Sequence, residues 1–269
     1  MDRSPGAWRW AIRILVTNDD GVQACGLWEL VKALAPENQV TVVAPDREQS
    51  GVGTAISLHR ILRVKPVQAE VPSVTAYAVE GTPGDCVILG IGRLCPDAEL
   101  VIAGINEGAN LGDDVFISGT VGAALQARFR GLPAMAVSIS DLGSEHYETA
   151  ARVAARLVRA LADGELPADT LLNINVPDLP AREIRGVVVA RQARRKYSDA
   201  VREETDARGK VYFWLVRGHT EWEDVEGTDI WAIRNGLISI IPLDTDVRRD
   251  GEVSAVQALC GPVQDDLRE

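Results

Sequence analysis

Residues 12–21, IRILVTNDDG, decide how this chain of 269 residues folds. A run rich in β-branched side chains ends there in a polar turn, which is typical of a buried strand. Apolar residues then recur at the spacing of one helix face, at Leu27, Leu30, Val31 and Leu34. Residues 39–44, QVTVVA, follow as a second buried strand. The order strand, turn, helix, strand is a βαβ unit and implies a parallel sheet.

The same alternation continues along the chain. Further strands are predicted at residues 99–104, 133–140 and 170–177, and helices at 84–94, 118–129 and 148–162. Residues 61–64 and 75–81 indicate an antiparallel excursion. We therefore predict the α/β fold class, as a doubly wound, Rossmann-like three-layer sandwich.

The character of the sequence changes near residue 184. We predict an N-terminal extension over residues 1–11, an α/β catalytic domain over 12–183, and a C-terminal oligomerisation arm and tail over 184–269. Within the last part, residues 236–243 are expected to return as a strand. The segment KVYFWLV at 210–216 flanks a highly charged stretch, which predicts a β-hairpin arm. This strand is too apolar to stand alone in water, so we expect it to pack on a partner subunit.

Composition and charge exclude several classes of protein. The chain has 28 basic and 39 acidic residues, a net charge of −11 and 46% hydrophobic residues, which excludes a disordered chain. The acidic balance argues against a nucleic-acid polymer or a membrane surface as partner. The four cysteines are not closely paired, which favours a reducing cytoplasm: Cys25, Cys86, Cys95 and Cys260. A small anionic substrate stays possible, provided that the site supplies local positive charge.

Asp19 and Asp20 directly follow the first strand, at the edge where parallel sheets place their ligands. Two carboxylates about 4 Å apart repel each other by roughly 4 kcal/mol near a protein surface. A protein therefore keeps such a pair around a cation or exposes it to solvent. A solvated Asx-turn is the alternative for this motif taken alone.

Two further loops carry polar side chains after predicted strands, and a third opens a helix. Ser50 lies in a glycine-rich loop, Asn106 follows the third strand, and Ser118-Gly119-Thr120 opens a helix whose free N–H groups can seat an anion. A plain loop, a turn-forming Asn and an ordinary N-cap are the respective alternatives. Together, four hard oxygen ligands converge at one sheet edge: Asp19, Asp20, Ser50 and Asn106. Such a set favours Mg²⁺, Mn²⁺ or Ca²⁺ over zinc and indicates metal-assisted phosphoryl hydrolysis.

Four motifs also carry a resemblance to a known family. They are ILVTNDDG at 14–21, VAPDREQSG at 43–51, GINEGANLGDDVFISGTVGAA at 104–124 and NINVP at 173–177. In this order the sequence resembles the SurE survival-protein family of metal-dependent nucleotidases and acid phosphatases. A weaker likeness covers residues 206–215 and 227–243.

The resemblance implies a phosphomonoesterase that hydrolyses nucleoside 5′- and 3′-monophosphates, with short polyphosphate as a further substrate. It implies one divalent ion per subunit, Mg²⁺ or Mn²⁺ with Ca²⁺ or Co²⁺ as further candidates, held by the four oxygen ligands. By the same resemblance, Asn110 and the loop Ser118–Thr120 contact phosphate or its water, and Asp19 shares the role of general base with the metal. It also implies a dimer or tetramer formed by exchange of C-terminal elements, a swapped tail.

Two alternatives stay open for the function. One is a nucleotide-binding regulator that does not hydrolyse its ligand. The other is a phosphatase that forms an aspartyl-phosphate, although such enzymes usually space their two aspartates by one residue, whereas Asp19 and Asp20 are adjacent.

Overall fold

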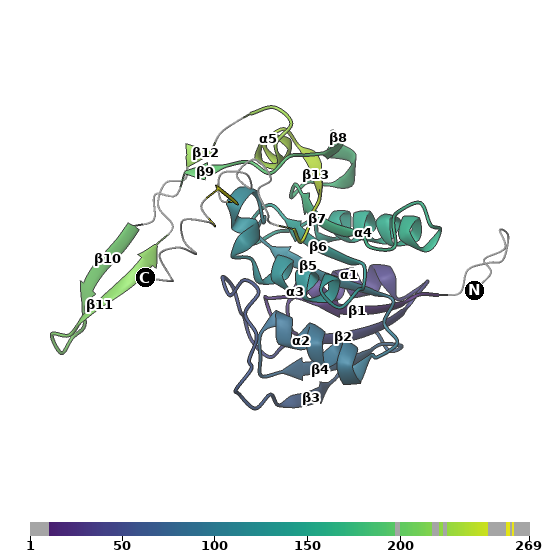
Figure 1. Cartoon of the computed structure of the whole chain (residues 1–269), viewed down its shortest axis with the longest axis horizontal. Coiled ribbons are helices and arrows are strands. Elements are labelled where there is room, and N and C mark those ends of the chain that lie inside the picture. The colour runs from purple at the N-terminus through teal and green to yellow at the C-terminus, as the bar shows by residue number, and fades with distance from the viewer. Residues whose placement is uncertain are drawn as a thin grey trace.

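The computed structural model describes residues 11–196, 200–216, 221–222, 225–246, 257–258 and 260. Nine strands form one sheet: β1 (Arg13–Thr17), β2 (Gln39–Pro45), β3 (Val64–Val67), β4 (Thr75–Val79), β5 (Leu100–Glu107), β6 (Ala134–Ile139), β7 (Leu171–Val176), β8 (Gly186–Val189) and β13 (Leu237–Pro242). Their spatial order is β3-β4-β2-β1-β5-β6-β7-β13-β8 (Figure 1). The strands from β4 to β7 run parallel, while β3 is antiparallel to β4 and β13 is antiparallel to β7.

Helices cover both faces of the sheet, so the body has three layers. The four that pack on it are α1 (Cys25–Leu34), α2 (Pro83–Leu89), α3 (Gly119–Arg128) and α4 (Tyr147–Ala162). Ile14 and Val16 of β1 share a core with α1 and α4, whereas Leu15 shares the opposite core with α2 and α3. This alternation follows from the two-residue period of a strand, and it buries β1 on both faces.

The α/β prediction is confirmed, and three local details differ from the expectation. The helix expected over 84–94 is α2 followed by a π-helix over Gly90–Leu94. The strand expected at 61–64 is β3, which begins at Val64, because Ile61 is exposed and pairing with β4 starts at Val64. The strand expected at 236–243 is β13, and it lies between β7 and β8. The main sheet therefore continues past residue 183, and the division into domains stays a prediction.

The remaining elements lie beyond β8 in the sequence. They are β9 (Arg195–Lys196), β10 (Ala200–Thr205), β11 (Val211–Val216), β12 (Glu221–Trp222) and α5 (Asp229–Arg234). Two 3-10 turns, Gly112–Phe116 and Ala181–Glu183, precede β8. Strands β10 and β11 form a two-stranded antiparallel ribbon that projects away from the body (Figure 1). Most of the predicted N-terminal extension and of the predicted tail lie outside the described residues. Among the helices that the structure describes, none is long and apolar enough to cross a membrane.

Candidate functional site

A pocket of about 1470 Å³ opens at the carboxyl ends of β1, β5, β6 and β7. Its wall includes six of the residues predicted from the sequence and reaches well beyond them. The predicted residues are Asp19, Asp20, Ser50, Asn106, Asn110 and Ser118. The additional ones include Glu48, Glu107, Asp114, residues 140–144, Tyr147, Pro177, Asp178, Leu179, Ile230, Ile233 and Arg234. These six residues therefore meet at one place, the edge expected for an open parallel sheet.

Asp19 is held at the end of β1 by the start of α3. Its side chain is only 4% exposed. Oδ2 accepts the backbone N–H of Thr120 at 3.2 Å, and Oδ1 accepts the Thr120 hydroxyl. Burial raises the pKa of Asp19, and the hydrogen bonds from Thr120 oppose that rise. The carboxylate thus lies in a fixed orientation at a helix N-terminus, where a negative charge is favourable.

Asp20 lies beside Asp19 and is partly buried. Its Oδ2 accepts the backbone N–H of Glu107 at 3.2 Å, which links the end of β1 to the end of β5. Burial, followed by the charge of Asp19 and then those of Glu107 and Glu48, raises the pKa of Asp20 to about 7. A second carboxylate therefore ionises here with difficulty unless a positive charge is supplied.

The pocket is acidic as a whole. Seven of its lining residues are acidic, and Arg234 is the one basic residue among the described residues that line it. No group of three His, Cys, Asp or Glu side chains in the described ranges is arranged to hold a metal. A metal set here would instead combine two carboxylates with neutral oxygens, and a hard divalent cation accepts such ligands. A cation would relieve the repulsion that raises the pKa of Asp20, so the chemistry of these donors is compatible with a hard divalent ion.

The two neutral ligand candidates lie on either side of the carboxylates. Ser50 lines the pocket from an exposed loop, and its hydroxyl donates to Glu48 at 2.7 Å. Asn106 is buried near the end of β5, and its amide nitrogen donates to the carbonyl of Gly108. This bond turns the amide so that its nitrogen is occupied and its oxygen is the group left for a cation. The structure therefore brings the candidate set together, and its role as a ligand set stays a prediction.

Asn110 is fixed by the strands beneath it. Its side-chain nitrogen donates to Ser138 Oγ at 2.8 Å, and its backbone N–H donates to Asn175 Oδ1 at 2.8 Å. Its carbonyl accepts from the amides of Asn173 and Asn175. The NINVP motif thus has a physical function here, because two buried β7 side chains hold the Asn110 loop at the pocket.

The loop Ser118–Thr120 does more than line the pocket, because it also caps α3 and contacts Asp19. Ser118 caps α3 by accepting the N–H of Val121 at 3.1 Å, and it also lines the pocket. Gly119 lies against Asp19: a β-carbon there would be 2.8 Å from Asp19 Oδ2. Thr120 is fully buried and bonds to Asp19 rather than facing the pocket. The start of α3 therefore packs directly onto the first carboxylate.

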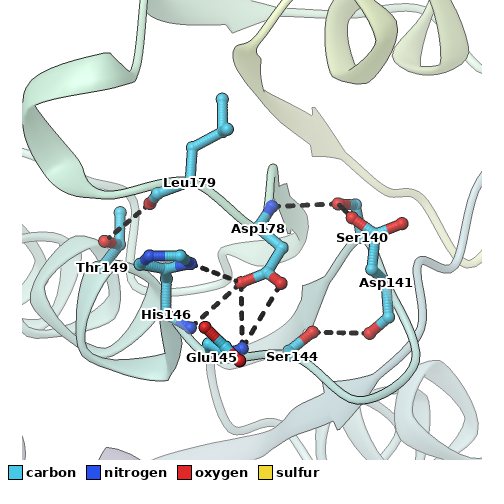
Figure 2. A network of polar contacts seen from close by, with 8 residues as sticks. All are labelled: Ser140, Asp141, Ser144, Glu145, His146, Thr149, Asp178 and Leu179. Atoms are coloured by element: carbon cyan, nitrogen blue, oxygen red, sulfur yellow. Dashed lines mark hydrogen bonds and ion pairs between the residues drawn. The ribbon is translucent and has the colours of Figure 1, made fainter.

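Sequence reasoning missed the far wall of the pocket. We call residues 140–146 the β6 loop. The wall comprises residues 140–144 of this loop and Asp178, which follows β7. Figure 2 shows that the Asp178 carboxylate faces the His146 ring and the backbone of Glu145. The rule that located Asp19 and Asn106, polar side chains at the carboxyl ends of parallel strands, also applies to β6 and β7 and could have found it.

Fold and site together define the class: an α/β protein whose acidic pocket, at the carboxyl ends of parallel strands, brings carboxylate, amide and hydroxyl oxygens together beside a helix N-terminus. Residues 14–199 match the family described as Survival protein SurE. The 5′-nucleotidase SurE of Geobacter sulfurreducens is 47% identical over 249 residues, covering 92% of this chain and 93% of that protein. The 5′-nucleotidase SurE of Dehalococcoides mccartyi is 44% identical, covering 95% and 100%, respectively.

A structural comparison gives the same family as these sequence matches. The crystal structure of the SurE protein from Aquifex aeolicus superposes with a TM-score of 0.78 at 36% identity, covering 92% of this chain and 99% of that one. The chain belongs to the SurE survival-protein family. The resemblance found in the sequence is thereby confirmed.

Proposed function

We propose that this protein is a divalent-metal-dependent 5′-nucleotidase that hydrolyses nucleoside monophosphates to nucleoside and phosphate, at the 3′ as well as the 5′ position. One observation carries the proposal: the buried carboxylate of Asp19 is bonded to the N-terminus of α3 and lies beside the partly buried Asp20, in a pocket large enough for a nucleotide. The relatives named 5′-nucleotidase SurE support the substrate class. Short polyphosphate is a further proposed substrate.

The proposed chemistry divides between a cation and the chain. A Mg²⁺ or Mn²⁺ ion held by Asp19, Asp20, Ser50 and Asn106 would polarise the phosphate and lower the pKa of an attacking water. Asn110, fixed by Asn173 and Asn175, would place an amide beside the phosphate oxygens. Ser118 and the first N–H groups of α3 supply the positive end of a helix dipole on the same side.

The hydrogen bonds of Asp19 favour this chemistry over an aspartyl-phosphate intermediate. Both carboxylate oxygens of Asp19 already accept hydrogen bonds from Thr120. Each bond stabilises the charged oxygen and reduces its nucleophilicity, whereas both are compatible with a role in orienting a ligand or a water.

Metal dependence is tested by removing and restoring the ion. Protein treated with a chelator should release no phosphate from adenosine 5′-monophosphate, and added Mn²⁺ or Mg²⁺ should restore release. Asp20→Asn should lower turnover at least 100-fold with Mn²⁺ present, on the scale seen when an electrostatic group at the reacting centre is removed. Equal activity with and without chelator would refute the proposed metal chemistry.

We also propose that the chain forms a homodimer or homotetramer through its C-terminal arm. The β10–β11 ribbon leaves apolar side chains bare on both of its faces, including Phe213, Trp214 and Leu215. An isolated two-stranded ribbon is marginally stable in water, so a second copy of the chain is the natural cover. In this assembly, we propose, the subunits exchange their C-terminal tails. We also propose that the sheet is doubly wound and that the protein is cytoplasmic.

A further inference from the structure

The pocket extends along the sheet edge, away from the carboxylate pair and toward β6 and β7. Asp19 and Asp20 follow β1, the β6 loop follows β6, and β5 lies between these two strands. Neighbouring strands are about 4.8 Å apart, so about 10 Å separates the carboxylates from the β6 loop. On the opposite side, toward β2, the lining is limited to Glu48, Ser50 and Gly51. A ligand whose phosphate lies at β1 therefore has room to extend toward β6 and β7.

We propose that the β6 loop forms the nucleoside half of the pocket and that Asp178 is the residue that positions it. This inference rests on the proposed nucleotidase function and deepens it, because it assigns the base-binding wall. Asp178 acts through the loop and is a positioning residue, while Leu142 contacts the nucleoside.

Asp178 holds the loop at its C-terminal end. One carboxylate oxygen accepts the backbone N–H of His146 at 3.0 Å and contacts the His146 ring at Nδ1, also at 3.0 Å. Both oxygens accept the backbone N–H of Glu145 at 3.3 Å. The Asp178 side chain is 15% exposed, so these bonds are well shielded from water (Figure 2). A carboxylate that accepts two backbone N–H groups fixes the backbone itself, not merely a side chain.

The start and the middle of the loop are held as well. The backbone N–H of Asp178 donates to Ser140 Oγ at 2.9 Å, so the same residue grips both ends of the loop. The N–H of Gly143 donates to the side chain of Glu107, whose own N–H donates to Asp20. A continuous chain of hydrogen bonds therefore joins Asp20 to the β6 loop and the loop to Asp178. These bonds fix the position of the loop relative to the carboxylate pair, where the phosphate is proposed to bind.

Leu142 supplies apolar surface at the tip of this loop. Its side chain is 82% exposed and yet lines the pocket. It lies over Gly108, where a β-carbon would meet Leu142 Cδ2 at 3.4 Å. An exposed leucine adds nothing to the core, but it can bury apolar area against the face of a nucleobase. Leu142 is therefore placed to contact the nucleoside of a bound substrate.

The test compares two substrates that share a phosphate and differ in what carries it. With Mn²⁺ present, Asp178→Ala should raise the KM for adenosine 5′-monophosphate about tenfold, because the loss of bonds to a charged group loosens the loop. Its kcat/KM for p-nitrophenyl phosphate, which has no nucleoside, should change less than threefold. Asp178→Asn keeps one acceptor oxygen and should lie between wild type and Asp178→Ala. Inhibition by adenosine should weaken in parallel with the KM.

Leu142→Ala provides a second variant that carries no risk to folding, since the side chain is exposed. Its KM for adenosine 5′-monophosphate should rise about fivefold while kcat stays within twofold. Glu148→Gln is the matched control: this exposed residue at the start of α4 loses the same charge as Asp178→Asn, two residues from His146. It should behave as wild type on both substrates.

The possible outcomes separate the inference from the function on which it rests. A rise in KM confined to the nucleotide supports the inference. Equal losses on both substrates in folded Asp178→Ala, or unchanged kinetics in both Asp178→Ala and Leu142→Ala, would overturn it. A wild-type protein that hydrolyses neither substrate with any divalent ion would instead refute the proposed function.

Discussion

At the scale of single residues, the pair Asp19–Asp20 lowers the stability of the metal-free protein at neutral pH. Desolvation and the charge of Asp19 raise the pKa of Asp20 from 3.8 to about 7. Below pH 4 Asp20 is protonated in the folded and in the unfolded state, and it then has no effect on stability. Between pH 4 and pH 7 only the folded state keeps the proton, so the stability of the metal-free protein falls as the pH rises.

Asp20→Asn removes this pH dependence because an amide does not ionise. In chelator, the variant should match wild type near pH 4 and exceed its free energy of unfolding by about 4 kcal/mol at pH 8. Urea denaturation at both pH values measures the difference. Added Mn²⁺ should then stabilise wild type and leave the variant unchanged, because only wild type has the second carboxylate. A difference that does not vary with pH would show that Asp20 ionises freely.

At the scale of elements, α3 lies very close to the loop that follows Ser50. A β-carbon at Gly122 would lie 2.2 Å from the carbonyl oxygen of Gly53, so backbone would have to move. Gly122→Ala should therefore destabilise the protein by about 1–3 kcal/mol and lower activity, because α3 also holds Asp19. Thermal melts and phosphate release measure the two effects.

Gly92→Ala is the control for that substitution. Gly92 lies in the π-helix that follows α2, and a β-carbon there would have no neighbour within 4 Å. The melting temperature of this variant should equal or slightly exceed that of wild type, since alanine reduces the entropy lost on folding. If Gly122→Ala and Gly92→Ala have the same melting temperature, the close approach of α3 is unimportant for stability.

The elements also show how far sequence reasoning reaches. The buried strands can be recognised in the sequence as short apolar runs: β1, β2, β5, β6 and β7. Asp19, Asp20 and Asn106 can then be predicted from their positions at strand ends. The insertion of β13 between β7 and β8 has no local signal, because strand order depends on contacts distant in sequence. The same holds for Thr120 as a partner of Asp19, and for the grip of Asp178 on the β6 loop. These contacts depend on how separate loops meet, which no spacing encodes.

At the scale of the whole molecule, the acidic pocket and the apolar β10–β11 ribbon are two separate features. The acidic lining of the pocket repels a phosphate, so the proposed metal dependence would follow from the pocket as a whole rather than from two residues. The β10–β11 ribbon, by contrast, exposes apolar side chains. It projects away from the main sheet and its helices (Figure 1). Catalysis and assembly are therefore expected to respond to different substitutions.

The ribbon allows this separation to be tested. Leu215 is 87% exposed and lies opposite Val201 in the β10–β11 pairing, on the same face as Phe213. If a second copy covers this face, Leu215→Glu buries an unpaired charge in the interface, which costs several kcal/mol. Light scattering after gel filtration should then show a smaller species than wild type. Lys210→Glu, in the turn that joins the two strands, adds the same acidic side chain away from the apolar face and should keep the wild-type mass. An unchanged mass for Leu215→Glu would mean that the ribbon face is not the surface that joins the subunits, because a buried carboxylate without a partner cannot be accommodated there at no cost.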